Sequence, residues 1–257
     1  MSCAGRPKGL HYPSRAWLAL AAGTVALGCW SPAATTAASS DARLLVRPRT
    51  PTVSVEPGEH PLGLSAGRDG ILYVPKAVAS QTPVPLLVML HGAGSSARNV
   101  RFTFPLAEEF GVVILAPDSR SSTWGAVGGS FGRDVAFIDR ALQYAFERVA
   151  VGPGRLAVGG FSDGASYALS LGMANGDLFT QVIAFSPGFI RPATPTGRPP
   201  IFLSHGTQDQ MLPIDVTSRR IVPRLKSAGY TVTVREFDGP HAVPEPIARE
   251  AFEWLTR

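Results

Sequence analysis

Cysteine is scarce in this chain, and its two cysteines, Cys3 and Cys29, both fall within the first 38 residues. The rest of the sequence contains none, which excludes a disulfide framework, a thiol nucleophile and a thiolate metal site there. A domain of this length buries enough apolar surface to fold without disulfides, so their absence is compatible with export.

Charged residues are also few, at 17% against 45% hydrophobic residues, and this balance indicates a folded globular protein. The formal net charge is +5, but Arg6, Lys8 and Arg15 lie in an initial stretch that holds no acidic residue. Without these three, the 24 basic residues fall to 21 against 19 acidic ones, and no basic block remains. We therefore expect no binding to nucleic acid.

The first 38 residues have the pattern of a targeting segment. Basic residues precede the apolar run "AWLALAAGTVALGCW", which has the length of a signal-peptide core and is too short for a comfortable membrane span. We predict an export signal over residues 1–38, with cleavage after Ala33 or Ala38 and no membrane-spanning segment after it. Alternatively, Ala26–Cys29 resembles a lipoprotein box, in which Cys29 would carry a lipid anchor.

Residues 31–58 are rich in Ala, Ser, Thr and Pro, and beyond the leader we predict a disordered linker at 39–58 before one folded domain at 59–257. Strand-like apolar segments lie at 70–75, 85–92, 111–118, 155–162, 181–188, 200–206 and 231–239, and helical patterns at 132–149, 165–175, 215–229 and 244–257. Most of the strand segments are continuously apolar, which is typical of parallel strands covered on both faces. The alternation predicts an α/β domain with a mostly parallel central sheet, helices on both faces and ligands at the carboxyl ends of the strands.

The pattern G-x-S-x-G occurs three times, around Ser65, Ser130 and Ser162. A nucleophilic serine on such a pattern needs a buried strand before it and a helix after it, so that a tight turn projects the hydroxyl above the sheet. Another strand follows Ser65, which predicts a β-hairpin, and no strand precedes Ser130. Only Ser162 lies between "RLAVGGF" and "ASYALSLGMA", so we predict that Ser162 is the nucleophile.

A serine hydroxyl needs a base, and that base needs a carboxylate to orient it. Asp209 follows the strand that ends at Gly206, and His241 follows the last strand, which gives the chain order nucleophile, acid, base. The rival acids fit less well, since Asp215 opens a helix and Asp238 lies only three residues before His241.

The other histidines of the domain are weaker candidates for the base. His60 precedes the sheet, and His91 and His205 each stand in a His-Gly pair at a strand end, where a structural hydrogen bond is the ordinary role. The oxyanion that forms on the substrate carbonyl during the attack would need hydrogen bonds from two backbone amides. We expect these from Asp163, directly after the nucleophile, and from Ala93 in the loop after the strand 85–92.

The segments "LLVMLHGAGSS", "LAVGGFSDGASYALSLG", "FLSHGTQDQMLP" and "GPHAVP" resemble the α/β-hydrolase superfamily. The likeness is greatest to its phospholipase/carboxylesterase branch, which includes acyl-protein thioesterase-like and feruloyl-esterase-like members, and it runs from about residue 60 to residue 257. It implies a triad of Ser162, Asp209 and His241, oxyanion-hole amides at Ala93 and Asp163, and no metal or organic cofactor.

The same resemblance implies that Gly92, Gly94 and Trp124 line the substrate site, although Trp124 also fits a surface aromatic that packs a loop. The segment "IRPATPTGRPP" is too short for a large lid, which argues against a lipase. We therefore expect an exported serine carboxylesterase that acts on a small-molecule ester through an acyl-enzyme.

Two alternatives stay open. A serine peptidase of the dipeptidyl-peptidase kind would share this triad, and a non-catalytic binding protein would share the fold but usually lacks a triad member. The sequence leaves the acyl group, the alcohol and the oligomeric state undetermined.

Overall fold

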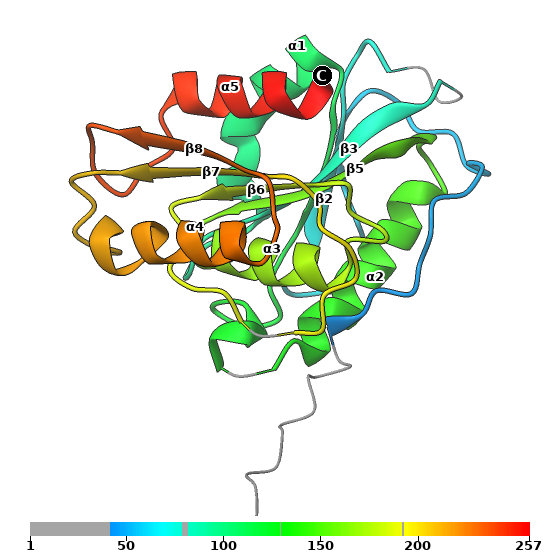
Figure 1. The fold of residues 1–257 in the computed structure, drawn as a ribbon. Helices are drawn as coiled ribbons and strands as arrows, with labels where there is room; N and C mark the ends of the chain where they lie inside the picture. The colour runs from blue at the N-terminus through cyan, green and yellow to red at the C-terminus, as the bar shows by residue number, and fades with distance from the viewer. Residues whose placement is uncertain (1–41, 79–81, 129, 192) are drawn as a thin grey trace, which may run out of the picture. The chain divides into compact units, whose positions relative to one another are not determined.

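The computed structural model describes residues 42–78, 82–128, 130–191 and 193–257. An eight-stranded sheet in the order β1-β2-β4-β3-β5-β6-β7-β8 forms its centre (Figure 1). The strands are β1 (Gly58–Pro61), β2 (Gly70–Val74), β3 (Val84–Leu90), β4 (Val113–Pro117), β5 (Val151–Phe161), β6 (Gln181–Phe185), β7 (Ile201–Gly206) and β8 (Val232–Phe237). Strands β3 to β8 pair in parallel, while β1 and β2 pair antiparallel at one edge.

Helices cover both faces of this sheet, as Figure 1 shows. Helices α2 (Gly132–Phe146), α3 (Asp163–Ala174) and α4 (Ser218–Ser227) lie on one face, and α1 (Phe104–Phe110) and α5 (Glu245–Thr256) lie on the other. Three short 3-10 helices, η2 (Ala97–Thr103), η3 (Gly125–Gly128) and η4 (Ile214–Val216), occur in the connections. The predicted fold class, a mostly parallel sheet between two helical layers, is confirmed.

Strand β3 illustrates why the continuous apolar runs become central strands. All seven of its residues are buried. Because side chains alternate across a strand, Leu86, Val88 and Leu90 pack in the core on the α2–α3–α4 side, whereas Leu87 and Met89 pack on the α1–α5 side. Full burial of each of these side chains contributes about 2 kcal/mol to folding. Every predicted strand overlaps a strand of the structure.

Strand β1, at one edge of the sheet, was not predicted from the sequence. Strand β1 pairs with β2, and its residues alternate between half-buried and exposed. Four residues with that alternation give too weak an apolar signal to identify a strand. The expected hairpin is present, because Ser65 lies in the connection between these two antiparallel strands.

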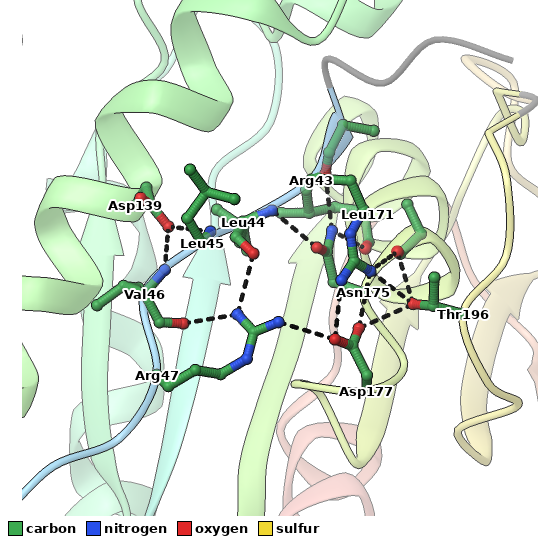
Figure 2. Close-up of polar contacts among 12 residues, drawn as sticks. Arg43, Leu44, Leu45, Val46, Arg47, Asp139, Leu171, Asn175, Asp177 and Thr196 are labelled. Carbon is green, nitrogen blue, oxygen red and sulfur yellow. Dashed lines mark hydrogen bonds and ion pairs between the residues drawn. The ribbon is translucent and has the colours of Figure 1, made fainter.

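Residues 42–47, called the N-terminal strap below, differ from the predicted disordered linker. Ala42 and Leu44 are buried in the core that contains α2 and α3. Asn175, the residue at the end of α3, accepts a hydrogen bond from the Leu44 amide at 2.8 Å and donates one to the Ala42 carbonyl at 2.8 Å (Figure 2). The strap is therefore part of the folded domain, which begins before the predicted residue 59.

Ion pairs and further amide contacts fasten the same strap. Arg43 and Arg47 both bind the carboxylate of Asp177, each at 2.8 Å (Figure 2). The amides of Leu45 and Val46 donate to Asp139 of α2, at 2.8 and 2.9 Å. An interpretation from Ala, Ser, Thr and Pro content missed these contacts because their partners lie far away in the sequence.

The predicted export signal at 1–38, its cleavage sites and the lipid anchor at Cys29 lie outside the described residues, as do residues 39–41. Within the part of the chain that is described, no helix is long and apolar enough to cross a membrane.

Candidate active site

Ser162 lies in the tight turn between β5 and α3. Its backbone has φ 58° and ψ −121°, a conformation that costs an L-residue free energy and that marks a strained turn. Glycines on either side make the turn possible. A Cβ at Gly160 would lie 2.4 Å from the carbonyl of Gly164, and one at Gly164 would lie 2.3 Å from the carbonyl oxygen of Leu90.

Asp209 lies in the loop after β7, where its side chain is fully buried. Its Oδ1 accepts hydrogen bonds from the amides of Met211 and Leu212, at 2.9 and 2.8 Å. Burial acts to raise the pKa of Asp209, but the Leu212 amide and the neighbouring imidazoles of His241 and His205 outweigh it and lower that pKa below its ordinary value. The acid is thus held as a carboxylate in one orientation.

His241 follows β8, and its Nδ1 lies 2.5 Å from Oδ2 of Asp209. The phenyl ring of Phe161 packs against the imidazole at 4.7 Å between ring centres. Because Nδ1 faces the carboxylate, the other ring nitrogen, Nε2, is left to act on a substrate or nucleophile. Three sequence-predicted residues therefore come together, since Ser162 and His241 line the same cavity and Asp209 supports His241 from behind.

That cavity has a volume of about 430 Å³. It is lined by His91, Gly92, Ala93, Ser95, Asn99, Val100, Phe102, Phe161, Ser162, Met211, His241, Ala242 and Val243. Phe102 and Met211 remain 40% and 75% exposed. Large apolar side chains at an open cavity favour an apolar group on the bound molecule.

The loop after β3 brings Gly92 and Ala93 to this cavity. Gly94 is not among the lining residues, because its amide donates to the Ser122 carbonyl at 2.7 Å and holds the loop from behind. Within the described residues, no hydrogen bond takes up the amides of Ala93 or Asp163. Both amides therefore remain available as donors, and that of Asp163 is an unpaired first amide of helix α3.

Trp124 does not line the cavity, which corrects one sequence-based expectation. Its side chain is almost fully buried, its indole N–H donates to the His91 carbonyl at 2.8 Å, and its ring packs against Tyr167. A buried tryptophan needs an acceptor for its N–H, and the His91 carbonyl provides one beneath the loop. Trp124 supports the cavity wall from the core and is not a surface aromatic.

His91 has the structural role expected of it. Its Nε2 accepts the Ser119 amide at 3.0 Å, so the ring proton lies on Nδ1 and is donated to the Gly92 carbonyl at 2.7 Å. Burial lowers the pKa of His91 and keeps the ring neutral. Arg68 braces the same loop, since it donates to the carbonyl of Ser95 at 2.7 Å; no sequence motif pointed to Arg68.

The rival candidates lie away from this cavity. Asp238 accepts a hydrogen bond from Gln208, Asp215 is exposed and paired with Arg219, and the His60 ring contacts the Glu56 carbonyl. The carboxylate of Asp163 accepts the hydroxyl proton of Thr123 at 2.7 Å, so this side chain has a structural partner.

The sequence indicated a structural role for His205 but not its position beside the acid. Nε2 of the buried His205 lies 3.1 Å from Oδ2 of Asp209, the same oxygen that His241 contacts. The spacing of four residues between His205 and Asp209, across a strand end and a tight turn, is the only signal that the sequence offered. Within the described residues, no group of three or more His, Cys, Asp or Glu side chains is arranged to hold a metal ion.

The chain is also similar to known proteins. A family model described as phospholipase/carboxylesterase matches residues 110–255, a range that contains Ser162, Asp209 and His241 but not Ala93. Feruloyl esterase C of Emericella nidulans is 27% identical over 158 residues, which cover 58% of this chain and 57% of that protein. The chain therefore spans little more than half the length of that relative.

Two solved structures share the fold. The structure of esterase PE8 matches 72% of this chain and 96% of its own, with a TM-score of 0.58 and 21% identity. That of a phospholipase/carboxylesterase from Dyadobacter fermentans matches 74% of this chain and 97% of its own, with a TM-score of 0.58 and 19% identity.

Proposed function

The chain belongs to the phospholipase/carboxylesterase family, and we propose that it is a serine carboxylesterase that hydrolyses small-molecule esters through an acyl-enzyme on Ser162. One observation carries the proposal. A strained serine at a strand-to-helix turn shares its cavity with a histidine whose Nδ1 contacts a buried carboxylate at 2.5 Å. This is the arrangement that nucleophile, base and acid need for acyl transfer.

In the proposed mechanism, Nε2 of His241 takes the proton of the Ser162 hydroxyl while Oγ attacks the ester carbonyl. The amides of Ala93 and Asp163 donate hydrogen bonds to the oxyanion that forms. The imidazolium then protonates the leaving alcohol, and the carbon–oxygen bond of the ester breaks. Asp209 holds the imidazole in one tautomer and stabilises its positive charge in both steps.

The second half of the reaction uses the same groups. A water molecule enters the open cavity, His241 removes one of its protons, and the oxygen attacks the acyl carbonyl. Collapse of the second tetrahedral intermediate returns the proton to Oγ of Ser162 and releases the carboxylic acid. No step requires a metal ion or an organic cofactor.

The cavity supports an apolar acyl or alcohol group, because Val100, Phe102, Met211 and Val243 line it. The relative from Emericella nidulans is named a feruloyl esterase. A methyl hydroxycinnamate ester therefore belongs in a substrate panel, beside p-nitrophenyl esters graded by acyl length and an aminoacyl anilide. Faster turnover of the anilide than of every ester would favour a peptidase instead.

Substitution of the nucleophile tests the mechanism. We expect Ser162→Ala to lower kcat/KM for p-nitrophenyl esters by at least about 10,000-fold, and to abolish covalent labelling by a fluorophosphonate. Ser65→Ala and Ser130→Ala are matched controls, because each serine stands in a G-x-S-x-G pattern, and both should keep wild-type turnover. Wild-type turnover or labelling in Ser162→Ala would overturn the mechanism.

We also propose that residues 1–38 direct export. The basic residues before a short apolar run support this proposal. Mass spectrometry of the protein recovered outside the cytoplasm would locate the new N-terminus. A start at residue 34 or 39 fits signal-peptide cleavage, a lipid mass on Cys29 fits a lipoprotein, and an intact Met1 in a cytoplasmic fraction contradicts export.

A further inference from the structure

His205 is completely buried, and both of its ring nitrogens have polar partners. It lies in β7, three residues after Phe202, and its Nε2 is 2.8 Å from the carbonyl oxygen of Leu212 and 3.1 Å from Oδ2 of Asp209. Its Nδ1 is 2.6 Å from the hydroxyl oxygen of Ser218. A histidine that served packing alone would not need to face the acid of the site.

These contacts fix where the ring proton lies. Both atoms that face Nε2, a carbonyl oxygen and a carboxylate oxygen, only accept hydrogen bonds. A neutral ring must therefore carry its proton on Nε2, where it is donated to the Leu212 carbonyl with Oδ2 of Asp209 close by. Nδ1 then accepts the proton of the Ser218 hydroxyl. Burial lowers the pKa of His205, which keeps the ring neutral and in this tautomer.

The carboxylate of Asp209 is consequently held on every side. Its Oδ1 receives two backbone amides, and its Oδ2 receives His241 and His205. Three hydrogen bonds and the close Nε2 of His205 thus surround the two oxygens of this carboxylate. Without His205, Oδ2 would lose one of its two polar neighbours, and His241 alone would hold that oxygen.

We infer that His205 is a positioning residue for the catalytic acid, with Ser218 holding its tautomer. The inference rests on the proposed function for its catalytic meaning. His205 does not touch the substrate cavity, since it is not among the residues that line it. It acts through Asp209, whose orientation and basicity determine how strongly the imidazolium of His241 is stabilised during acyl transfer.

Other charged groups near His205 are held by partners of their own. On the far side of the ring, a small cavity of about 190 Å³ separates α4 from β8, and Arg219 and Glu236 line it together with His205 and Ser218. Arg219 and Glu236 form an ion pair with each other. On the near side, the titratable groups that face His205 are Asp209 and His241.

Steady-state kinetics of two substitutions test the inference. His205→Leu removes the donor to Asp209, and we expect kcat to fall about 10- to 100-fold with little change in KM, as for a misplaced catalytic group. The acid limb of the pH profile of kcat/KM should move to higher pH, because a carboxylate that has lost a donor attracts the imidazolium proton more strongly. His205→Gln offers a side-chain N–H near the position of Nε2 and should restore both kcat and the pH profile.

A matched control lies next to His205 on the same strand. Ser204 is also buried, and its hydroxyl makes no hydrogen bond within the described residues, so Ser204→Ala should leave kcat, KM and the pH profile unchanged. The inference is overturned if His205→Leu keeps wild-type kcat, or if the Leu and Gln variants lose activity equally with an unshifted pH profile.

If His205→Leu fails to fold, a measurement on the wild-type protein still tests the inference. Long-range proton–nitrogen NMR of the histidine rings identifies the tautomer, and we expect the His205 proton on Nε2. A proton on Nδ1 would overturn the inference, because Nε2 could then donate nothing to Asp209. The tautomer does not depend on ester chemistry, so this result is separate from the Ser162→Ala test of the proposed function.

Discussion

The two ends of helix α3 are built in opposite ways. At its N-terminus, Ser162 has a strained backbone and the amide of Asp163 is left without a partner in the described residues. At its C-terminus, the side chain of Asn175 makes three hydrogen bonds, to Leu44, Ala42 and Leu171, and is completely buried. One end keeps strain and an unused donor, and the other end is fastened to the N-terminal strap through the side chain of Asn175.

Helix α3 thus has one end built for reactivity and the other end built for stability. A site for acyl transfer needs donors that are not yet occupied, and these cost stability when no substrate is bound. The helix spans about 18 Å, so a fastening at the far end can compensate without entering the cavity. Substitutions at the two ends should therefore have opposite consequences for activity and for unfolding.

The largest effect is expected at Ser162. Ser162→Ala and Ser162→Gly both remove the proposed nucleophile and should lower kcat/KM by at least about 10,000-fold. Glycine also relaxes the positive φ, so Ser162→Gly should be more stable than Ser162→Ala by about 1 kcal/mol in urea denaturation. Equal stabilities would mean that this backbone conformation stores no strain.

The next largest effect is expected at Gly164, which packs against β3. A Cβ there would lie 2.3 Å from the Leu90 carbonyl oxygen and 2.4 Å from that of His91, and backbone atoms cannot move aside singly. Gly164→Ala should lower the free energy of unfolding by about 3 kcal/mol and also reduce kcat, because α3 carries the amide of Asp163. A fully stable, fully active variant would contradict the tight contact between α3 and β3.

At the other end of the helix, Asn175→Ala should affect stability alone. It leaves the buried amide of Leu44 and the carbonyl of Ala42 without partners, so we expect the free energy of unfolding to fall by about 3 kcal/mol. Turnover per folded molecule should not change. Leu45→Ala is the control on the same strap, because this side chain is 81% exposed and its loss should cost little. Loss of turnover in folded Asn175→Ala would show that the two ends are coupled.

The smallest effect is expected at Asp177. Its ion pairs with Arg43 and Arg47 are partly exposed, so Asp177→Asn should cost less than about 1 kcal/mol at neutral pH. Hydrogen bonds from Arg43 lower the pKa of Asp177 below its ordinary range, so this stability is present above about pH 4 and is lost as the pH falls through the lowered pKa. Thermal unfolding of the wild-type protein and of Asp177→Asn should be measured from pH 7 to pH 2. The difference between their Tm values should shrink as the pH falls.

The central strands and the elbow could be predicted from the sequence because their signals are local. Val158 and its apolar neighbours read as a strand buried on both faces, and Ser162 stands directly between that strand and a helical pattern. The loops that carry Asp209 and His241 also follow recognisable strands. Their contact at 2.5 Å agrees with their predicted pairing, while their catalytic roles stay predictions until the substitutions are made.

The strap, Trp124 and His205 could not be predicted in the same way. Leu44 and Asn175 are 131 residues apart, and nothing near Leu44 indicates which residue will accept its amide. The residues next to Trp124 in the sequence are typical of a loop, although its ring is buried under the His91–Gly94 loop. These residues acquire their roles from packing between segments that are distant in the chain.

The position of β8 determines when the proposed triad can be complete. β8 is the last described strand in the chain and pairs only with β7 at the sheet edge, and His241 follows it directly. A chain in which β8 has not docked would lack His241, the proposed base, in its place beside Asp209. Under the proposed mechanism, esterase activity in a refolding experiment should therefore return no earlier than the docking of β8. During synthesis, a growing chain would likewise lack the proposed base until His241 has been added.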